Sequence, residues 1–139
     1  MSSALSFSTA TARFSTVTPA GTARRRAAEI SGRTAERDAA VYLAGRGLTV
    51  LAQRLRTGVG EIDLVLADRD TLVFVEVKAR SSLAEAAYAV SPRQQGRLLE
   101  AASVAMARHP EWARSCTRFD VILYGSGACQ HIEDAVRYQ

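Results

Sequence analysis

Two apolar segments, residues 60–66 and 72–80, restrict the fold of this sequence more than any other feature. Both are rich in Val, Ile, Leu and Phe, and a short polar stretch separates them, a pattern that predicts two antiparallel strands joined by a tight turn. If residues 69 and 70 form the centre of the turn, Val65 lies opposite Phe74. The sequence therefore predicts a β-hairpin with a definite register.

The same register brings the charged residues of the hairpin together. Asp63 lies opposite Glu76 and Glu61 lies opposite Lys78, and because side chains alternate along a strand, all four share one face. Two facing carboxylates repel each other by roughly a few tenths of a kcal/mol to 1 kcal/mol, so we expect a cation between them. Mg²⁺, which prefers oxygen ligands, is the natural candidate. The alternative is an exposed hairpin whose charges are ordinary solvated residues.

Lys78 is the only lysine among the 18 basic residues of the chain. Lysine is a compact donor whose pKa shifts readily, whereas arginine keeps its proton in proteins. A composition that otherwise uses only arginine therefore favours a functional role for Lys78. The alternative is chance, since a single lysine must stand somewhere.

The composition indicates one domain preceded by a tail. The chain has 139 residues, of which 47% are hydrophobic and 23% are charged, as in ordinary globular proteins. Residues 1–28 are rich in Ser, Thr and Ala and hold four arginines without an acidic residue, so we predict a disordered tail there and one domain over residues 29–139. A transit peptide, a mis-assigned start or a dispensable bacterial extension would have the same composition. Because the net charge of +4 resides in this tail, nucleic-acid binding by the domain requires a local basic patch.

Several kinds of site are disfavoured by the sequence. Cys116 and Cys129 form no paired motif, so we expect neither a zinc site nor a disulfide framework. His109 and His131 have no Ser or Cys partner in a recognisable triad pattern. No apolar run approaches the roughly 18 residues that a membrane-spanning helix needs, and we expect a cytoplasmic protein without a membrane partner.

A helix is predicted over about residues 31–46, with Gly47 just after its end. Glu36 falls on the same stripe as Ala39 and Leu43, the stripe expected to face the core. A carboxylate on such a stripe must be paired, hydrogen-bonded or bound to a metal ion. The alternative is that Glu36 lies at the rim of the stripe, where its charge suits the start of the helix.

Two further groups of residues are candidate phosphate contacts. Arg54 and Arg56 lie on a strand predicted over residues 48–56, although solvated arginines are common on edge strands. Ser91 and the proline after it predict the start of a second helix, which stops before the proline at position 110. Its first turns carry three polar residues that would suit a phosphate or an ordinary solvated helix start: Arg93, Gln94 and Arg97.

A fourth strand is predicted over residues 117–124, followed by a short terminal element. Asp120 is the single acidic residue of that strand. We expect it to have a structural role, paired with Arg118 or with a helix end.

The predicted order of helix, three strands, helix and strand, with Glu36, Asp63 and the run Glu76-Val77-Lys78, resembles the PD-(D/E)XK nuclease superfamily. Within it the chain is similar to the YraN family over roughly residues 30–138. The matching stretches are Gly32 to Gly47 around Glu36, Gly60-Glu61-Ile62-Asp63-Leu64, Leu72 to Arg80 and Arg118-Phe119-Asp120-Val121. Two positions depart from the family pattern: Arg54 stands where the family often has Asn, and Arg93 where it often has Lys.

The resemblance implies an α/β fold with a restriction-endonuclease-like core, a mixed four-stranded sheet flanked by helices, similar to archaeal Holliday-junction resolvases. It also implies Mg²⁺ or Mn²⁺ as cofactor, held by Asp63 and Glu76 with Glu36 completing or supporting the shell. Lys78 would orient the attacking water or steady the phosphate. The expected nucleic-acid-binding residues are Arg80, Arg54, Arg56, Arg93, Gln94 and Arg97.

We therefore expect a metal-dependent endonuclease that hydrolyses phosphodiester bonds in branched or otherwise structured DNA, in the setting of DNA repair. RNA as the substrate and a homodimeric assembly stay open. The alternatives are a non-catalytic nucleic-acid-binding or repair-accessory protein that keeps the fold, and a small interaction domain with no nucleic-acid role. The complete carboxylate and lysine set favours the nuclease, because a binding protein has no need of it.

Overall fold

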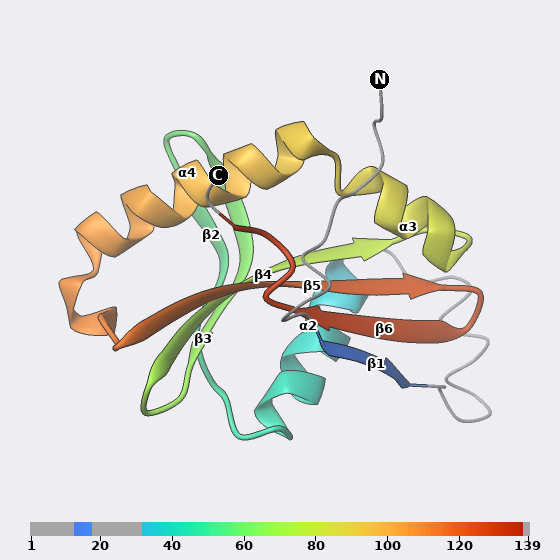
Figure 1. Cartoon of the computed structure of the whole chain (residues 1–139), viewed down its shortest axis with the longest axis horizontal. Helices are drawn as coiled ribbons and strands as arrows, with labels where there is room; N and C mark the ends of the chain where they lie inside the picture. The colour runs from blue at the N-terminus through green and yellow to red at the C-terminus, as the bar shows by residue number, and fades with distance from the viewer. Residues whose placement is uncertain (1–12, 18–31, 138–139) are drawn as a thin grey trace.

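The computed structural model describes residues 13–17 and 32–137. Within these ranges, six strands form one sheet in the order β1-β6-β5-β4-β3-β2 (Figure 1). The elements are β1 (Arg13–Val17), α2 (Gly32–Ala44), β2 (Thr49–Thr57), β3 (Gly60–Ala67), β4 (Thr71–Ala79), α3 (Leu83–Ala89), α4 (Pro92–Arg108), a 3₁₀ turn (Pro110–Trp112), β5 (Cys116–Gly125) and β6 (Ala128–Glu133).

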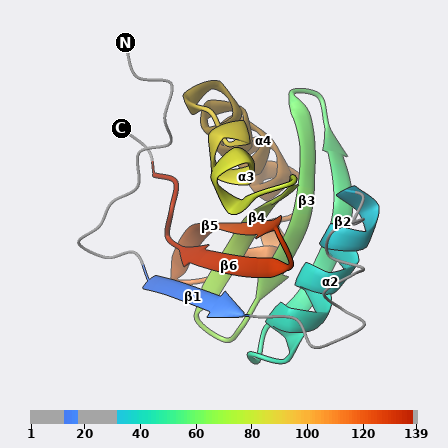
Figure 2. The same cartoon turned by 90° about the vertical axis from the view of Figure 1, so that its right-hand side faces the viewer.

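Helices cover both faces of the sheet. α3 and α4 lie on one face and α2 lies on the other (Figure 2). β2, β3 and β4 form an antiparallel meander, whereas β4 and β5 pair in parallel and are connected through α3 and α4. These features confirm the predicted α/β class with a mixed sheet between helices, and they are compatible with a restriction-endonuclease-like core. Among the described helices, none has both the length and the apolar character needed to cross a membrane.

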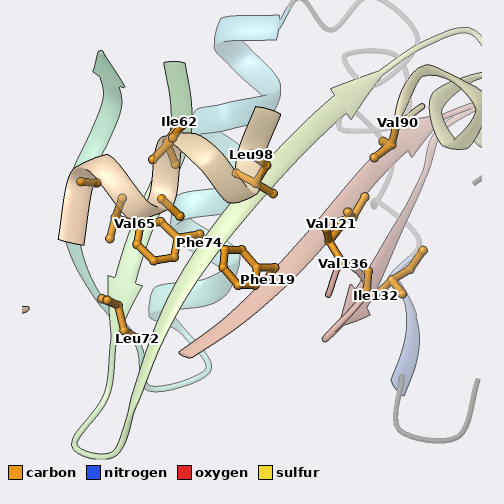
Figure 3. Close-up of a cluster of buried hydrophobic side chains, with 14 of the residues drawn as sticks. Ile62, Val65, Leu72, Phe74, Val90, Leu98, Phe119, Val121, Ile132 and Val136 are labelled. Carbon is orange, nitrogen blue, oxygen red and sulfur yellow. The ribbon is translucent and has the colours of Figure 1, made fainter. Parts of the chain in front are cut away.

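Two clusters of buried side chains hold the helices onto the sheet. The cluster under α3 and α4 includes Phe74 and Phe119, whose rings stack with centroids 5.6 Å apart (Figure 3). The cluster under α2 includes Leu43 of the helix and the alternate residues Val73 and Val75 of β4. β4 therefore has helices on both faces, which explains why its middle residues form a continuous apolar run.

β3 and β4 form the predicted hairpin. Val65 pairs with Phe74, as the sequence predicts. The ladder of paired residues ends at Leu64 and Val75, so the carboxylate pair predicted at the next position is not part of it. The predicted register is thus confirmed for the half of the hairpin near the turn, and the pairing stops where the charged residues begin.

The helix termini follow the sequence signals. The Ser91 hydroxyl accepts a hydrogen bond of 3.2 Å from the Gln94 N–H at the start of α4, as expected of an N-cap. α4 then ends at Arg108, ahead of the predicted proline stop. After α2, Gly47 adopts a φ of 93°, a left-handed conformation that glycine takes without steric cost.

The structure contains elements that the sequence did not predict. Arg13–Val17, inside the predicted disordered tail, forms β1 and pairs antiparallel with β6. A short segment with aromatic and β-branched residues can cover an otherwise unpaired sheet edge, and the predicted four-stranded sheet is therefore enlarged at this edge by β6 and β1. The other residues of the predicted tail, 1–12 and 18–28, lie outside the described residues. α3 falls in a segment for which the sequence made no firm prediction.

Candidate functional site

Asp63 lies where the β3–β4 ladder ends. Its neighbours in β3, Ile62 and Leu64, are fully buried and anchor the strand. The Asp63 Oδ2 atom accepts a hydrogen bond of 2.8 Å from the N–H of Val77. The carboxylate thereby accepts the hydrogen bond of a buried strand residue's N–H. In a regular β-ladder, a backbone carbonyl of the neighbouring strand would accept this bond. This bond holds the Asp63 side chain against the charged end of β4.

Glu76 and Lys78 form an ion pair at that end of β4. The Lys78 Nζ atom is 3.0 Å from Glu76 Oε2, and both side chains are largely buried. Their spacing of two residues places them on one face of the strand, as predicted. The predicted cross-strand neighbour of Lys78, Glu61, instead pairs with Arg56 of β2.

The acidic groups here are only partly compensated. Burial, and next the charge of Glu76, raises the pKa of Asp63 to about 8, while the Val77 N–H and Lys78 act in the opposite direction. Burial also raises the pKa of Glu76 against the lowering effect of Lys78. The charge of Glu36 raises both pKa values further. Asp63, Glu76 and Glu36 therefore form one electrostatic unit, called the acidic unit below, and such perturbed groups are typical of functional sites.

Glu36 reaches the acidic unit from the start of α2. Its Oε1 atom is buried and has no hydrogen-bond partner in the part of the chain that the structure describes. The Arg54 Nε atom lies 3.8 Å from that oxygen, which is too long for a hydrogen bond. A buried acceptor left without a donor costs about 1 to 3 kcal/mol. The Glu36 Oε1 atom thus has Arg54 as an ion-pair partner but lacks a hydrogen-bond donor among the described residues.

Arg54 lies opposite Asp63 in an irregular part of the β2–β3 pairing. Its φ of 51° is left-handed, a conformation that costs a residue with a side chain about 1 to 2 kcal/mol. Around this position the faces of β3 exchange, because Ile62 packs under α4 whereas Leu64, two residues later, packs under α2. Regular alternation would place them together. The irregularity thus coincides with the site, as strained backbone often does.

A cleft of about 480 Å³ opens beside Glu36, between α2 and the β2–β3 hairpin. Arg54 and Arg56, which the sequence predicted as phosphate contacts, both line it, and so does Glu61. The Nε atoms of Arg54 and Arg56 lie 3.9 and 3.6 Å from the Glu61 carboxylate. The full lining is Arg33, Glu36, Arg37, Gln53, Arg54, Arg56 and Glu61.

Sequence reasoning missed Arg33 and Arg37 of this cleft. They are four residues apart on α2 and therefore share a face of the helix, and Glu36, three residues after Arg33, lies near the same face. That spacing is visible in the sequence. Its importance depends on α2 packing beside β2, which only the tertiary structure reveals.

The other predicted nucleic-acid-binding residues fall into two groups. Arg80 follows β4 directly, is exposed, and is near enough to act electrostatically on Glu76. Arg93, Gln94 and Arg97 are exposed on α4. Within the described residues, no hydrogen bond or ion pair links those three side chains to the acidic unit, and Arg97 lines a separate hollow at the tip of the β2–β3 hairpin.

A second cluster of buried charge, called the Asp120 cluster below, lies near the other end of α2. Asp120 and His131 are 0% and 1% exposed. The His131 Nε2 atom is 2.9 Å from Asp120 Oδ2, and the Tyr42 hydroxyl of α2 is 3.1 Å from His131 Nδ1. Arg118 donates to both Asp120 oxygens at 2.9 and 3.0 Å, which confirms the predicted pairing, and the Asp134 N–H donates to Oδ1 at 2.9 Å.

Asp120 is well compensated in this cluster. Burial alone would raise its pKa, but the hydrogen bonds from His131 and Arg118 outweigh that effect and lower the pKa. No partner of His131 was predicted from the sequence. The glycines at 125 and 127 were a usable signal, because a turn there pairs β5 with β6 and places His131 opposite Ile122, diagonal to Asp120.

The acidic unit is not a closed metal cage as it stands. In the part of the chain that the structure describes, no three His, Cys, Asp or Glu side chains are gathered closely enough to hold a metal ion together. The electrostatic coupling of Asp63, Glu76 and Glu36 is present, whereas their predicted role as metal ligands stays a prediction.

Known proteins are similar to this chain in sequence over most of its length. Residues 35–124 match the model of the uncharacterised protein family UPF0102. A UPF0102 protein of Acidiphilium cryptum is 55% identical over 115 residues, which cover 83% of this chain and 90% of the relative. A UPF0102 protein of Rhodopseudomonas palustris is 56% identical over 100 residues, covering 71% and 76%, and one of Azorhizobium caulinodans is 48% identical over 113 residues, covering 81% and 86%. The resemblance seen in the motifs is confirmed, and the chain belongs to the UPF0102 family, which is the YraN family.

Proposed function

We propose that this protein is a metal-dependent nuclease that hydrolyses phosphodiester bonds, with branched or otherwise structured DNA as its substrate. The observation that carries the proposal is the acidic unit beside Lys78, in which burial and Glu76 raise the pKa of Asp63 to about 8. Buried carboxylates with a purely structural role are compensated by donors. Asp63 has one donor, the Val77 N–H, and its pKa is still raised, which supports a role for the carboxylate beyond structure.

The residues of the acidic unit fit a hard divalent cation. Carboxylate oxygens are the ligands that Mg²⁺ and Mn²⁺ prefer, and the Glu36 Oε1 atom accepts no hydrogen bond from the described residues. Asp63 and Glu76 would hold the ion, with Glu36 supporting it. A bound divalent ion would supply charge neutralisation at the phosphate and would lower the pKa of water.

The remaining residues have roles that follow from their contacts. The Val77 N–H fixes the orientation of Asp63 at 2.8 Å. Lys78, held 3.0 Å from Glu76, is a compact donor that can steady the developing charge on the phosphate or orient the attacking water. Arg54 and Arg56 supply positive charge in the adjoining cleft, where a backbone phosphate is attracted.

The test is cleavage of a panel of linear and branched DNAs by the purified chain with Mg²⁺, Mn²⁺ or EDTA. We expect cleavage that requires the divalent ion. Lys78→Arg should lose most turnover while keeping DNA affinity, because guanidinium retains the charge but not the compact, titratable donor. Arg69→Ala, in the exposed β3–β4 turn, is the control and should cleave normally. No cleavage by the wild type on any DNA would end the nuclease proposal, and near-normal cleavage by Lys78→Arg would reduce Lys78 to a fixed charge.

A second candidate function is nucleic-acid binding without catalysis. The close Lys78–Glu76 pair and the lack of a three-ligand cluster in the described residues favour it, because both leave the site partly satisfied without a metal ion. This function predicts DNA affinity that is equal in EDTA and Mg²⁺ and unaffected by Asp63→Asn. Metal-dependent cleavage would exclude it.

A further inference from the structure

The cleft beside Glu36 carries an excess of positive charge. Four arginines and two glutamates line it. The two glutamates face the β2 side of the cleft, where Glu61 lies within 4 Å of both Arg54 and Arg56 and Glu36 lies 3.8 Å from Arg54. The charges of the β2 wall are therefore largely balanced within the protein.

The α2 wall of the cleft is different. Arg33 and Arg37 are exposed, and within the described residues neither takes part in an ion pair or a side-chain hydrogen bond. The first turn of α2 contains no acidic residue, so the partial positive charge at the start of a helix adds to the two arginines. The excess positive charge of the cleft thus lies on the α2 wall. It is carried by Arg33 and Arg37, which are one helical turn apart.

Two guanidinium groups on one wall suit a particular kind of ligand. Each guanidinium is a planar fork of donors that matches the oxygens of a phosphate, and arginine gives up little hydration when it binds one. The cleft volume of about 480 Å³ is in the range of pockets for small ligands. Gln53 adds an amide that can donate a further hydrogen bond to an oxygen.

The position of the cleft relates it to the acidic unit. Glu36 belongs to both. It lines the cleft, and its charge raises the pKa of Asp63, although burial and the charge of Glu76 have larger effects. A strand whose phosphate enters the cleft therefore passes the acidic unit with a neighbouring part of its backbone. Glu36 repels a phosphate that moves from the cleft into the acidic unit, which keeps the two positions separate.

We propose that the cleft is a phosphate subsite, in which Arg33 and Arg37 bind one phosphate of a nucleic-acid strand next to the position that is cut. The placement of this phosphate next to a cleaved bond rests on the proposed nuclease function. The binding of the phosphate does not depend on that function. The ligand chemistry is a phosphate group with oxygens free for two guanidinium forks. An internal phosphodiester and a terminal 5′-phosphate both have this chemistry.

The test measures binding of a fluorescent single-stranded oligonucleotide by anisotropy, in EDTA and at several salt concentrations. The double variant Arg33→Ala/Arg37→Ala is compared with Arg46→Ala/Arg69→Ala, which removes the same charge from the turn after α2 and from the β3–β4 turn. We expect the first variant to bind at least about tenfold more weakly at 0.1 M salt, with a shallower dependence of affinity on salt, and the control to change less than threefold. Melting temperatures of both variants exclude loss of the fold as the cause.

Two oligonucleotides distinguish the two sources of phosphate, one with a 5′-phosphate and one with a 5′-hydroxyl. If the cleft takes a terminal phosphate, the wild type binds the phosphorylated oligonucleotide more tightly, and the Arg33→Ala/Arg37→Ala variant loses that preference. If the cleft takes an internal phosphodiester, the variant loses affinity for both equally.

An affinity loss no larger than that of the control would overturn the phosphate subsite. Because binding is measured without metal, the result does not depend on cleavage. Failure of the wild type to cut any DNA would remove the nuclease function and leave the subsite standing, while normal cleavage with an unchanged affinity of the double variant would do the reverse.

Discussion

Asp63 on β3 and Asp120 on β5 lie on the two strands that flank β4, the first partly buried and the second fully buried, yet their surroundings affect their pKa values in opposite ways. For Asp63, burial and Glu76 raise the pKa to about 8. For Asp120, burial is outweighed by hydrogen bonds from His131 and Arg118, which lower the pKa. The same residue type on the same sheet is therefore costly to ionise in one place and stable as an anion in the other.

In this fold, a functional site and a structural one differ in how completely their buried polar atoms are paired. The Asp120 cluster satisfies its own charges, with donors on both carboxylate oxygens and partners on both His131 nitrogens. The acidic unit has one lysine for three carboxylates, and although Arg54 lies 3.8 Å from the Glu36 Oε1 atom, that oxygen has no hydrogen-bond donor among the described residues. Proteins break the rule of satisfied polar groups mainly where a ligand completes the set.

The largest expected effect comes from breaking the satisfied cluster. Asp120→Asn keeps the shape of the side chain but leaves Arg118 and His131 facing a neutral amide. We expect the free energy of unfolding to fall by about 3 to 5 kcal/mol, the usual cost of removing one partner of a buried ion pair. Urea denaturation measures it, with Asp70→Asn in the exposed turn as the control. A loss below about 1 kcal/mol would mean that the two clusters do not differ as described.

The same substitution in the acidic unit should have the opposite sign. Asp63→Asn removes a charge that the folded state disfavours, and the amide oxygen can still accept from the Val77 N–H. In EDTA at pH 8 we expect the free energy of unfolding to rise by more than about 1.4 kcal/mol, the equivalent of one pKa unit, because the folded state raises the pKa of Asp63 from 3.8 to about 8. Denaturation in urea checks this, and a clear destabilisation would contradict the description of Asp63 as uncompensated.

The pH dependence of stability sharpens the contrast. The folded-state pKa of Asp63, about 8, exceeds its ordinary value of 3.8, so the folded protein binds more protons than the unfolded chain between these values. The contribution of Asp63 to stability therefore falls as pH rises from about 4 to 8, and the gain of Asp63→Asn should grow over that window. The lowered pKa of Asp120 affects stability in a different pH range, because the contribution of Asp120 to stability is lost only as pH falls below about 4. A gain that is equal at pH 4.5 and pH 8 would be inconsistent with ionisation of Asp63 as its cause.

The smallest expected effect concerns Arg54, the strained residue opposite Asp63. Asparagine adopts the left-handed region more readily than arginine, and the ion pairs of Arg54 with Glu36 and Glu61, at 3.8 and 3.9 Å, are too long for hydrogen bonds. We expect Arg54→Asn to leave the free energy of unfolding unchanged or to raise it by up to about 1 kcal/mol. Arg56→Asn, at a regular strand position, is the control and should not gain stability. A loss above about 1 kcal/mol for Arg54→Asn would show that its ion pairs outweigh the strain.

The parts of the structure that follow local rules could be predicted from the sequence. The turn half of the hairpin, with Val65 opposite Phe74, follows from a period of two and a polar turn. The start of α4 follows from Ser91 and the proline after it. The grouping of Asp63 and Glu76 with Lys78 was also predicted from the hairpin register, although the ladder ends before these residues.

The parts that depend on distant contacts could not be predicted in this way. The left-handed Arg54 and the end of the ladder before Asp63 arise where β2, β3 and α2 meet, and no local pattern marks them. β1 depends on the edge that β6 offers. The pairing of His131 with Asp120 depends on a β5–β6 hairpin that was predicted only as a short terminal element.

The acidic unit around Asp63 should be completed by a divalent cation, whereas the Asp120 cluster is complete in itself. Titration of Mn²⁺ into the wild type, Asp63→Asn and the control Asp70→Asn, followed by calorimetry, tests it most directly. We predict saturable Mn²⁺ binding by the wild type and by Asp70→Asn that is lost in Asp63→Asn. Equal binding by the wild type and Asp63→Asn, or no binding by the wild type, would contradict the claim.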